Sequence, residues 1–137
     1  MTYQHPIKNM YGQMLATKPQ YNKLVANHET HEANMANYDP DVKLLAAAPV
    51  IKLFTPDANA TWLISELDPK TGIMFGLCDL GRGDCPQMGS VDLGELLALR
   101  GRFGLPIERD RHIRLPDVPL SVYAAQSHDR IVIPEEA

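Results

Sequence analysis

The stretch 91–110, VDLGELLALRGRFGLPIERD, constrains the fold most, because it marks both ends of a short helix and then leads into a strand. Asp92 is a typical N-cap, and Glu95 three residues later completes a capping-box pattern. Leu93, Leu96, Leu97 and Leu99 give this helix one apolar face, and Gly101 is expected to end it. The leucines should face a sheet, so the stretch predicts a helix packed on strands.

Upstream of this helix the apolar pattern changes to that of strands. Segments 50–56 (VIKLFTP) and 61–67 (TWLISEL) are strand-like, and the residues between them are those of a turn. They predict an antiparallel hairpin. A second turn signal, DPKTG, leads to a third strand and so to a three-stranded meander. This third strand is predicted at 73–80, and further strands are predicted at 90–92 and 105–115.

Residues 1–38 are predicted to form an N-terminal extension that is helical or partly mobile. Met10, Met14 and Leu15 fit one helical face, Pro19 should interrupt that helix, and a second short helix should begin near Gln20. The polar run that follows, ANHETHEANMAN, is compatible with a weak helix or a mobile loop.

The core domain is predicted at residues 39–125, followed by a C-terminal tail at 126–137. Asp39 and Pro40 favour the start of a short helix at 38–48, and LSVYAAQSH indicates another near the C-terminus. The predicted fold class is α+β, with a small, mostly antiparallel sheet of four to five strands and short helices packed on one face.

Charge and hydropathy exclude some functional classes. The net charge is −4, from 13 basic and 17 acidic residues, which argues against non-specific nucleic-acid binding through overall charge. Residues 100–114 nevertheless hold five arginines and two carboxylates. These arginines either form one basic patch on an acidic body or, as charged runs more often do, pair with nearby carboxylates. No apolar run approaches the roughly 20 residues that span a bilayer, and the N-terminal residues lack the apolar stretch of a signal peptide. A cytoplasmic protein is expected, without a membrane partner.

Several motifs together carry a family resemblance. They are KLFTPDA and TWL in the hairpin, FGLCDLG in the third strand, and LRG followed by GLPIERD. The chain resembles a bacterial family of small proteins known only as a domain of unknown function, and the resemblance covers residues 49–125. It implies a compact α+β domain and a setting on plasmids, integrative conjugative elements and phage-like regions. It implies no catalytic residue set.

The charged segment 108–111 is the first candidate site. Alternate side chains of a strand point to opposite faces, so Glu108 and Asp110 should share one face and Arg109 and Arg111 the other. Paired carboxylates can bind a cation or act as acid and base. Paired arginines can bind a carboxylate or a phosphate.

The turn at 56–62 is the second candidate site, because it places Asp57 near Trp62, the only tryptophan. An aromatic residue at the edge of a hairpin can anchor a partner protein, whereas a core position is the structural alternative for Trp62. For the charged strand, the structural alternative is that its charges pair across the sheet with Lys52 or Glu66.

Three other patterns fall short of a catalytic or metal site. His28 and His31 are three residues apart, not four as in zinc proteases, and a solvated polar segment explains them. Cys78 and Cys85 lack the further ligands of a zinc site, and Cys78 fits a small core residue. The glycines of 76–89 match no phosphate-loop spacing. No catalytic residue, metal or cofactor is therefore assigned.

Without a complete catalytic constellation, the sequence favours a non-enzymatic accessory protein of a mobile element that binds another protein, as yet unidentified. Nucleic-acid binding through the arginines of 100–114 is the main alternative, and a small enzyme that uses Glu108 and Asp110 is a further one. A free edge of the antiparallel sheet would also allow two copies to pair as a homodimer.

Overall fold

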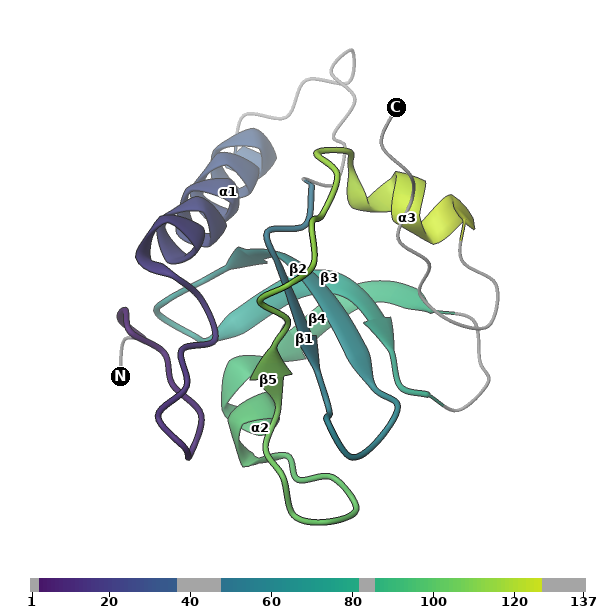
Figure 1. Cartoon of the computed structure of the whole chain (residues 1–137). Coiled ribbons are helices and arrows are strands. Elements are labelled where there is room, and N and C mark those ends of the chain that lie inside the picture. The colour runs from purple at the N-terminus through teal and green to yellow at the C-terminus, as the bar shows by residue number, and fades with distance from the viewer. Residues whose placement is uncertain (1–2, 37–47, 82–85, 127–137) are drawn as a thin grey trace.

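The computed structural model describes residues 3–36, 48–81 and 86–126 (Figure 1). A five-stranded sheet in the order β4-β3-β2-β1-β5 forms its centre, and all neighbouring strands are antiparallel. The α+β class predicted from the sequence is confirmed. The elements are α1 (Lys18–Ala36), β1 (Ile51–Phe54), β2 (Thr61–Leu67), β3 (Ile73–Asp79), β4 (Gln87–Asp92), α2 (Leu93–Ala98), β5 (Glu108–Arg109) and α3 (Leu120–Gln126).

The predicted meander of β1, β2 and β3 is confirmed. Ile51 pairs with Ile64 across the first hairpin, and Thr61 pairs with Asp79 across the second. β4 then pairs with β3 along its whole length and begins at Gln87, earlier than the predicted strand at 90–92. Its first residues, Gln87 and Met88, are both exposed, and no buried apolar residue alternates with them, so they lack the pattern by which a half-buried strand is detected.

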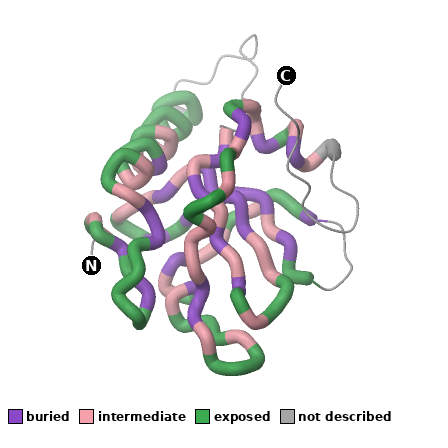
Figure 2. The backbone as a smooth tube through the Cα atoms, in the orientation of Figure 1, coloured by how far each residue is buried: buried purple, intermediate pink, exposed green. Residues whose placement is uncertain are grey.

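Both faces of the sheet are covered (Figure 2). Trp62 and Ile64 belong to a buried cluster with apolar residues of α1 and α2. Leu63 and Leu77, which point the other way, are buried with Tyr123 of α3. The prediction that helices pack on one face therefore holds for α1 and α2, whereas α3 covers the opposite face. The reason is that β2 is apolar at successive positions, and such a strand needs cover on both sides.

α1 differs from its prediction because Pro19 starts this helix and does not interrupt it. Pro19 lies in the first turn, where backbone N–H groups have no acceptor within the helix, so the absence of this group in proline breaks no helical hydrogen bond. The Thr17 hydroxyl accepts from the N–H of Gln20 at 3.3 Å, and the Gln20 side chain accepts from the N–H of Thr17 at 2.8 Å. This reciprocal capping box holds a 19-residue helix that includes the polar run.

The helix predicted from Met10 to Leu15 is wrong. The chain forms a tight hairpin there, closed by a bridge between Lys8 and Met14. The buried Asn9 side chain accepts from two backbone N–H groups inside this turn, at 3.0 and 3.1 Å. Such bonds from an asparagine compete with helical hydrogen bonds. Leu15 still enters the core, but Met10 and Met14 are exposed.

α2 confirms the helix predicted at Asp92, whose side chain accepts from the N–H of Gly94 at 2.7 Å. It ends at Ala98 and not at Gly101, because Leu99 is already extended. Three predictions concern residues outside the described ranges. Cys85 lies outside them, and so do nearly all residues of the helix predicted at 38–48 and of the predicted C-terminal tail. Within the described ranges, no helix is long and apolar enough to cross a membrane.

Candidate functional site

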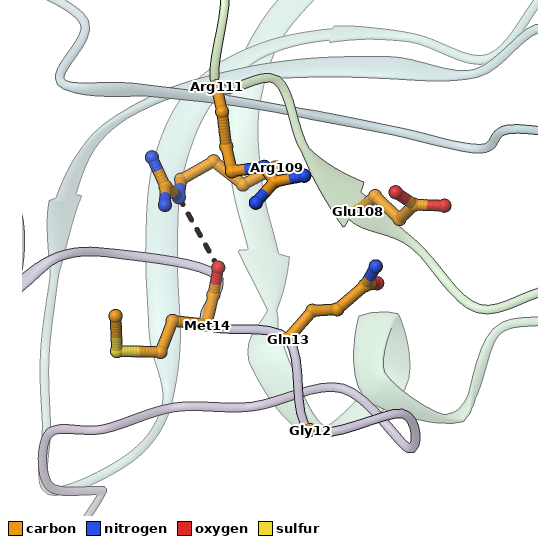
Figure 3. Close-up of a pocket in the computed structure, with 6 residues that line it drawn as sticks. All are labelled: Gly12, Gln13, Met14, Glu108, Arg109 and Arg111. Carbon is orange, nitrogen blue, oxygen red and sulfur yellow. Dashed lines mark hydrogen bonds between the residues drawn. The ribbon is translucent and has the colours of Figure 1, made fainter.

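The first candidate site lies where the N-terminal hairpin meets β5. The Asn9 side chain donates to the carbonyl of Ile107 at 3.0 Å, and Arg109 Nε donates to the carbonyl of Met14 at 3.3 Å. These two bonds join segments that are almost a hundred residues apart in sequence. Between them lies a pocket of about 270 Å³, which we call the arginine pocket (Figure 3). It is lined by Gly12, Gln13, Met14, Glu108, Arg109 and Arg111.

Two guanidinium groups share the arginine pocket. Arg109 uses its Nε for Met14, which leaves its terminal nitrogens as donors, and Arg111 enters from the turn after β5. Burial lowers the pKa of Arg109, and the positive charge of Arg111 lowers it further. No carboxylate of residues 3–36, 48–81 or 86–126 lies within 4.0 Å of a nitrogen of either group. The pocket thus holds two cations that a bound anion would stabilise.

The other walls of the arginine pocket are polar. Gln13 receives a hydrogen bond from Asn9 at its side-chain oxygen, at 2.7 Å, so its amide nitrogen is left as a donor. The Glu108 carboxylate stands on the rim and points away from both guanidinium groups (Figure 3). The pocket therefore combines several donors with one negative charge at its edge.

Asp110 does not join Glu108, although alternation along a longer strand predicted that they share a face. β5 ends at Arg109, and the Asp110 side chain accepts from the N–H of His112 at 3.0 Å, which turns the chain. Asp110 also forms an ion pair with Lys52 at 3.5 Å. Burial raises the pKa of this carboxyl, but the hydrogen bond from His112 and the charge of Lys52 outweigh burial and lower it overall. For Asp110, the ion pair with Lys52 that the sequence offered as the alternative to a binding role is therefore present.

Trp62 and Asp57 have separate positions. Trp62 is 3% exposed and belongs to the core, as its structural alternative predicted. Asp57 reaches across to the loop after α2, where its Oδ2 accepts from the N–H groups of Phe103 at 2.6 Å and Leu105 at 3.3 Å. Asp57 therefore fixes the conformation of this loop.

Trp62 also lines a largely apolar hollow of about 350 Å³, which we call the tryptophan groove. Its walls come from the β1–β2 turn, from Leu80 and Val91, and from α2. Phe103, which the sequence did not single out, stands beside it and is 79% exposed. The only sequence signal for this residue is an aromatic side chain flanked by arginine and glycine in a loop.

The arginines of 100–114 do not form one patch. Arg100 folds back on the end of α2 and donates to the carbonyls of Leu97 and Leu99, at 2.8 and 2.7 Å. It lines the tryptophan groove, whereas Arg109 and Arg111 line the arginine pocket. Three of the five arginines are thus divided between two hollows, and Arg102 and Arg114 line neither of them.

His28 and His31 contact carboxylates of the sheet instead of forming a wholly solvated segment. His31 Nδ1 lies 3.1 Å from both Glu66 oxygens. His28 lies 3.8 Å from Glu66 and 3.7 Å from Asp68. Among the residues that the structure describes, no group of three or more such side chains has a geometry that could hold a metal ion. These contacts tie α1 to the sheet.

The model of a protein family of unknown function, DUF2958, matches residues 15–133. The chain belongs to this family. The DUF2958 match extends beyond the resemblance at 49–125 and takes in all of α1. No curated protein and no solved structure matches the chain. Membership of the DUF2958 family assigns no activity to the chain.

Proposed function

We propose that this DUF2958 protein is a non-enzymatic binding protein that recognises a carboxylate of a partner protein in the arginine pocket. The observation that carries the proposal is the pair of guanidinium groups, Arg109 and Arg111, with no carboxylate of the described residues within 4.0 Å. A guanidinium presents a planar fork of donors that matches a carboxylate. A bound carboxylate would also offset the repulsion between the two cations.

The surroundings favour one discrete carboxylate over a nucleic-acid backbone. Glu108 on the rim repels further negative charge, and the whole chain carries a net charge of −4. Nucleic-acid affinity needs several phosphate contacts along a continuous basic surface. Arg100 lies at another hollow, so the arginines do not supply that surface. An acidic side chain or a chain terminus of a protein fits this pocket better.

The same geometry supports binding over catalysis. Glu108 lines the arginine pocket, whereas Asp110 is engaged with Lys52, so the two carboxylates do not act on one substrate atom. The mobile-element setting implied by the family resemblance is consistent with an accessory protein of this kind. The partner would then be a protein of the same element or of its host.

Selection from a random peptide library tests the proposal. We expect the full chain to enrich peptides with acidic residues, and we expect Arg109→Gln and Arg111→Gln each to weaken the selected peptides about tenfold or more, as for lost charge-assisted hydrogen bonds. Arg102→Gln is the matched control, because this arginine is exposed in the loop after α2 and does not line the pocket. It should change affinity by less than about twofold.

Two results would count against the proposal. One is enrichment of peptides without acidic residues, or of acidic peptides that bind both pocket variants as well as wild type. The other is DNA or RNA binding that is tighter than peptide binding and equally weakened by Arg102→Gln and Arg109→Gln. That pattern, with a steep dependence on salt, would instead support nucleic-acid binding.

A further inference from the structure

The loop after α2 presents Phe103 to solvent in a fixed position. The N–H of Phe103 donates to Asp57, the N–H of Gly101 donates to the carbonyl of Leu105 at 2.9 Å, and Gly104 closes the turn with a φ of 82°. A loop with these bonds does not need an exposed phenylalanine for its own stability. Figure 2 shows the loop as exposed, and Phe103 has the largest exposed fraction among the exposed large apolar residues of the described chain. Rigid aromatic side chains of this kind are the usual anchors of protein interfaces.

The tryptophan groove opens beside this loop. Gly101 belongs both to the loop and to the lining of the groove. The β1–β2 turn and the loop after α2 lie at the same end of the molecule (Figure 1). Leu80 and Leu99 on the groove walls are 52% and 38% exposed, so apolar surface stays open to water here. A projecting aromatic ring and a hollow that can receive one therefore stand next to each other.

We infer that two copies of this chain form a twofold dimer in which Phe103 of each copy fills the tryptophan groove of the other. A twofold interface requires that one surface contain both the projecting group and its receptor, and this end of the molecule does. An unrelated partner would need to supply both an apolar protrusion and a pocket for Phe103. A second copy already carries the two.

The same surface carries charges of both signs, and Arg100 on the groove wall already uses its guanidinium for the carbonyls of Leu97 and Leu99. Arg102, next to Phe103, is exposed, and Glu95 of α2 is exposed at the wall of the tryptophan groove. When Phe103 enters the partner's groove, Arg102 is brought toward the partner's Glu95 and the reverse contact forms by symmetry. This interface uses no residue of the arginine pocket, so it does not depend on the proposed function.

Sedimentation analysis of the full chain over a range of concentrations tests the inference. We expect wild type to dimerise, and we expect Phe103→Ala, which removes the projecting ring, to raise the dissociation constant about a hundredfold or more. Ala58→Arg places a charge in the groove from an exposed turn position and should act similarly. Met35→Ala is the matched control, because Met35 is 61% exposed on the last turn of α1. It should leave the dimer unchanged.

Mixing the two disruptive variants tests whether the exchange is reciprocal. Phe103→Ala keeps an open groove and Ala58→Arg keeps the ring, so the mixture regains one of the two contacts. We expect it to dimerise more tightly than either variant alone. A wild-type chain that stays monomeric at millimolar concentration would overturn the inference. So would a dimer that neither variant weakens, which would point to another surface such as the exposed edge at β4, or a mixture that shows no gain.

Discussion

The contact between Asp57 and Gly101 gives the sharpest test of how the loop after α2 is held. A Cβ added at Gly101 would collide with the Asp57 carboxylate, whereas the backbone of Gly101 has no unusual φ. Gly101→Ala therefore acts by displacing Asp57 and not by straining its own backbone. Asp57→Ala removes the same carboxylate directly. The two substitutions should damage one and the same arrangement.

The magnitude follows from the bonds that are lost. The Asp57 carboxylate accepts from the N–H groups of Phe103 and Leu105, and a hydrogen bond to a charged group contributes about 1.5–3 kcal/mol. The site is only partly buried, so we expect each single substitution to lower the free energy of unfolding by about 2–4 kcal/mol. In the double variant no carboxylate is left to collide, so the total loss should stay close to that of Asp57→Ala alone.

Chemical denaturation of wild type, the two single variants and the double variant measures this coupling. Gly89→Ala is the matched control, because a Cβ there meets no atom within 4 Å, and it should change the free energy of unfolding by less than about 1 kcal/mol. Additive losses in the double variant would refute the reasoning, since they would mean that Gly101 and Asp57 stabilise the loop independently.

Three further predictions test other parts of the fold. Burial raises the pKa of Tyr123 to about 12, so the free energy of unfolding should fall as the pH rises above about 10, and Tyr123→Phe should remove this dependence in denaturation curves at different pH values. Because the pKa of Asp110 is lowered in the folded protein, this carboxylate stabilises the fold at neutral pH, and the stabilisation is lost as the pH falls through its pKa. In denaturation curves at different pH values, Asp110→Asn should therefore reduce the fall in the free energy of unfolding at acid pH. Lys52→Met should reduce that fall in part. Thr17→Ala removes half of the capping box with Gln20 and should lower the free energy of unfolding by about 1 kcal/mol, seen as a shift in the denaturation midpoint.

The elements that the sequence predicted well are those with strong local signals. β1, β2 and β3 follow from short strand-like apolar segments separated by turn residues at 56–60 and 68–72, and α2 follows from its N-cap at Asp92. The start of α1 was missed because Pro19 was interpreted as a breaker, although the pair Thr17 and Gln20 marks it as a first-turn proline. The hairpin around Asn9 depends on side-chain bonds that no periodicity reveals.

In the candidate sites, too, features with a local sequence signal could be predicted, and features that depend on long-range packing could not. That Arg109 and Arg111 line one pocket agrees with their alternate spacing in the sequence. The contribution of Gln13 and Met14 to this pocket could not be predicted, because it depends on long-range packing of the N-terminal hairpin against β5. For Trp62, near Asp57, the sequence favours a core position, with a partner-binding role at the hairpin edge as the alternative. The structure buries Trp62 in the core. The exposed aromatic residue is Phe103, whose loop is held by Asp57 through a contact 46 residues away in sequence, which no local pattern reveals.

Anion binding by the arginine pocket is tested most directly by NMR of the arginine side chains during titration of the full chain with acetate. We expect the Nε–Hε signals of Arg109 and Arg111 to shift together along one saturable curve, while those of Arg100 and Arg102, which lie outside the pocket, shift little. Equal and unsaturable shifts of all four signals, or none at Arg109 and Arg111, would contradict the assignment of this pocket as the binding site.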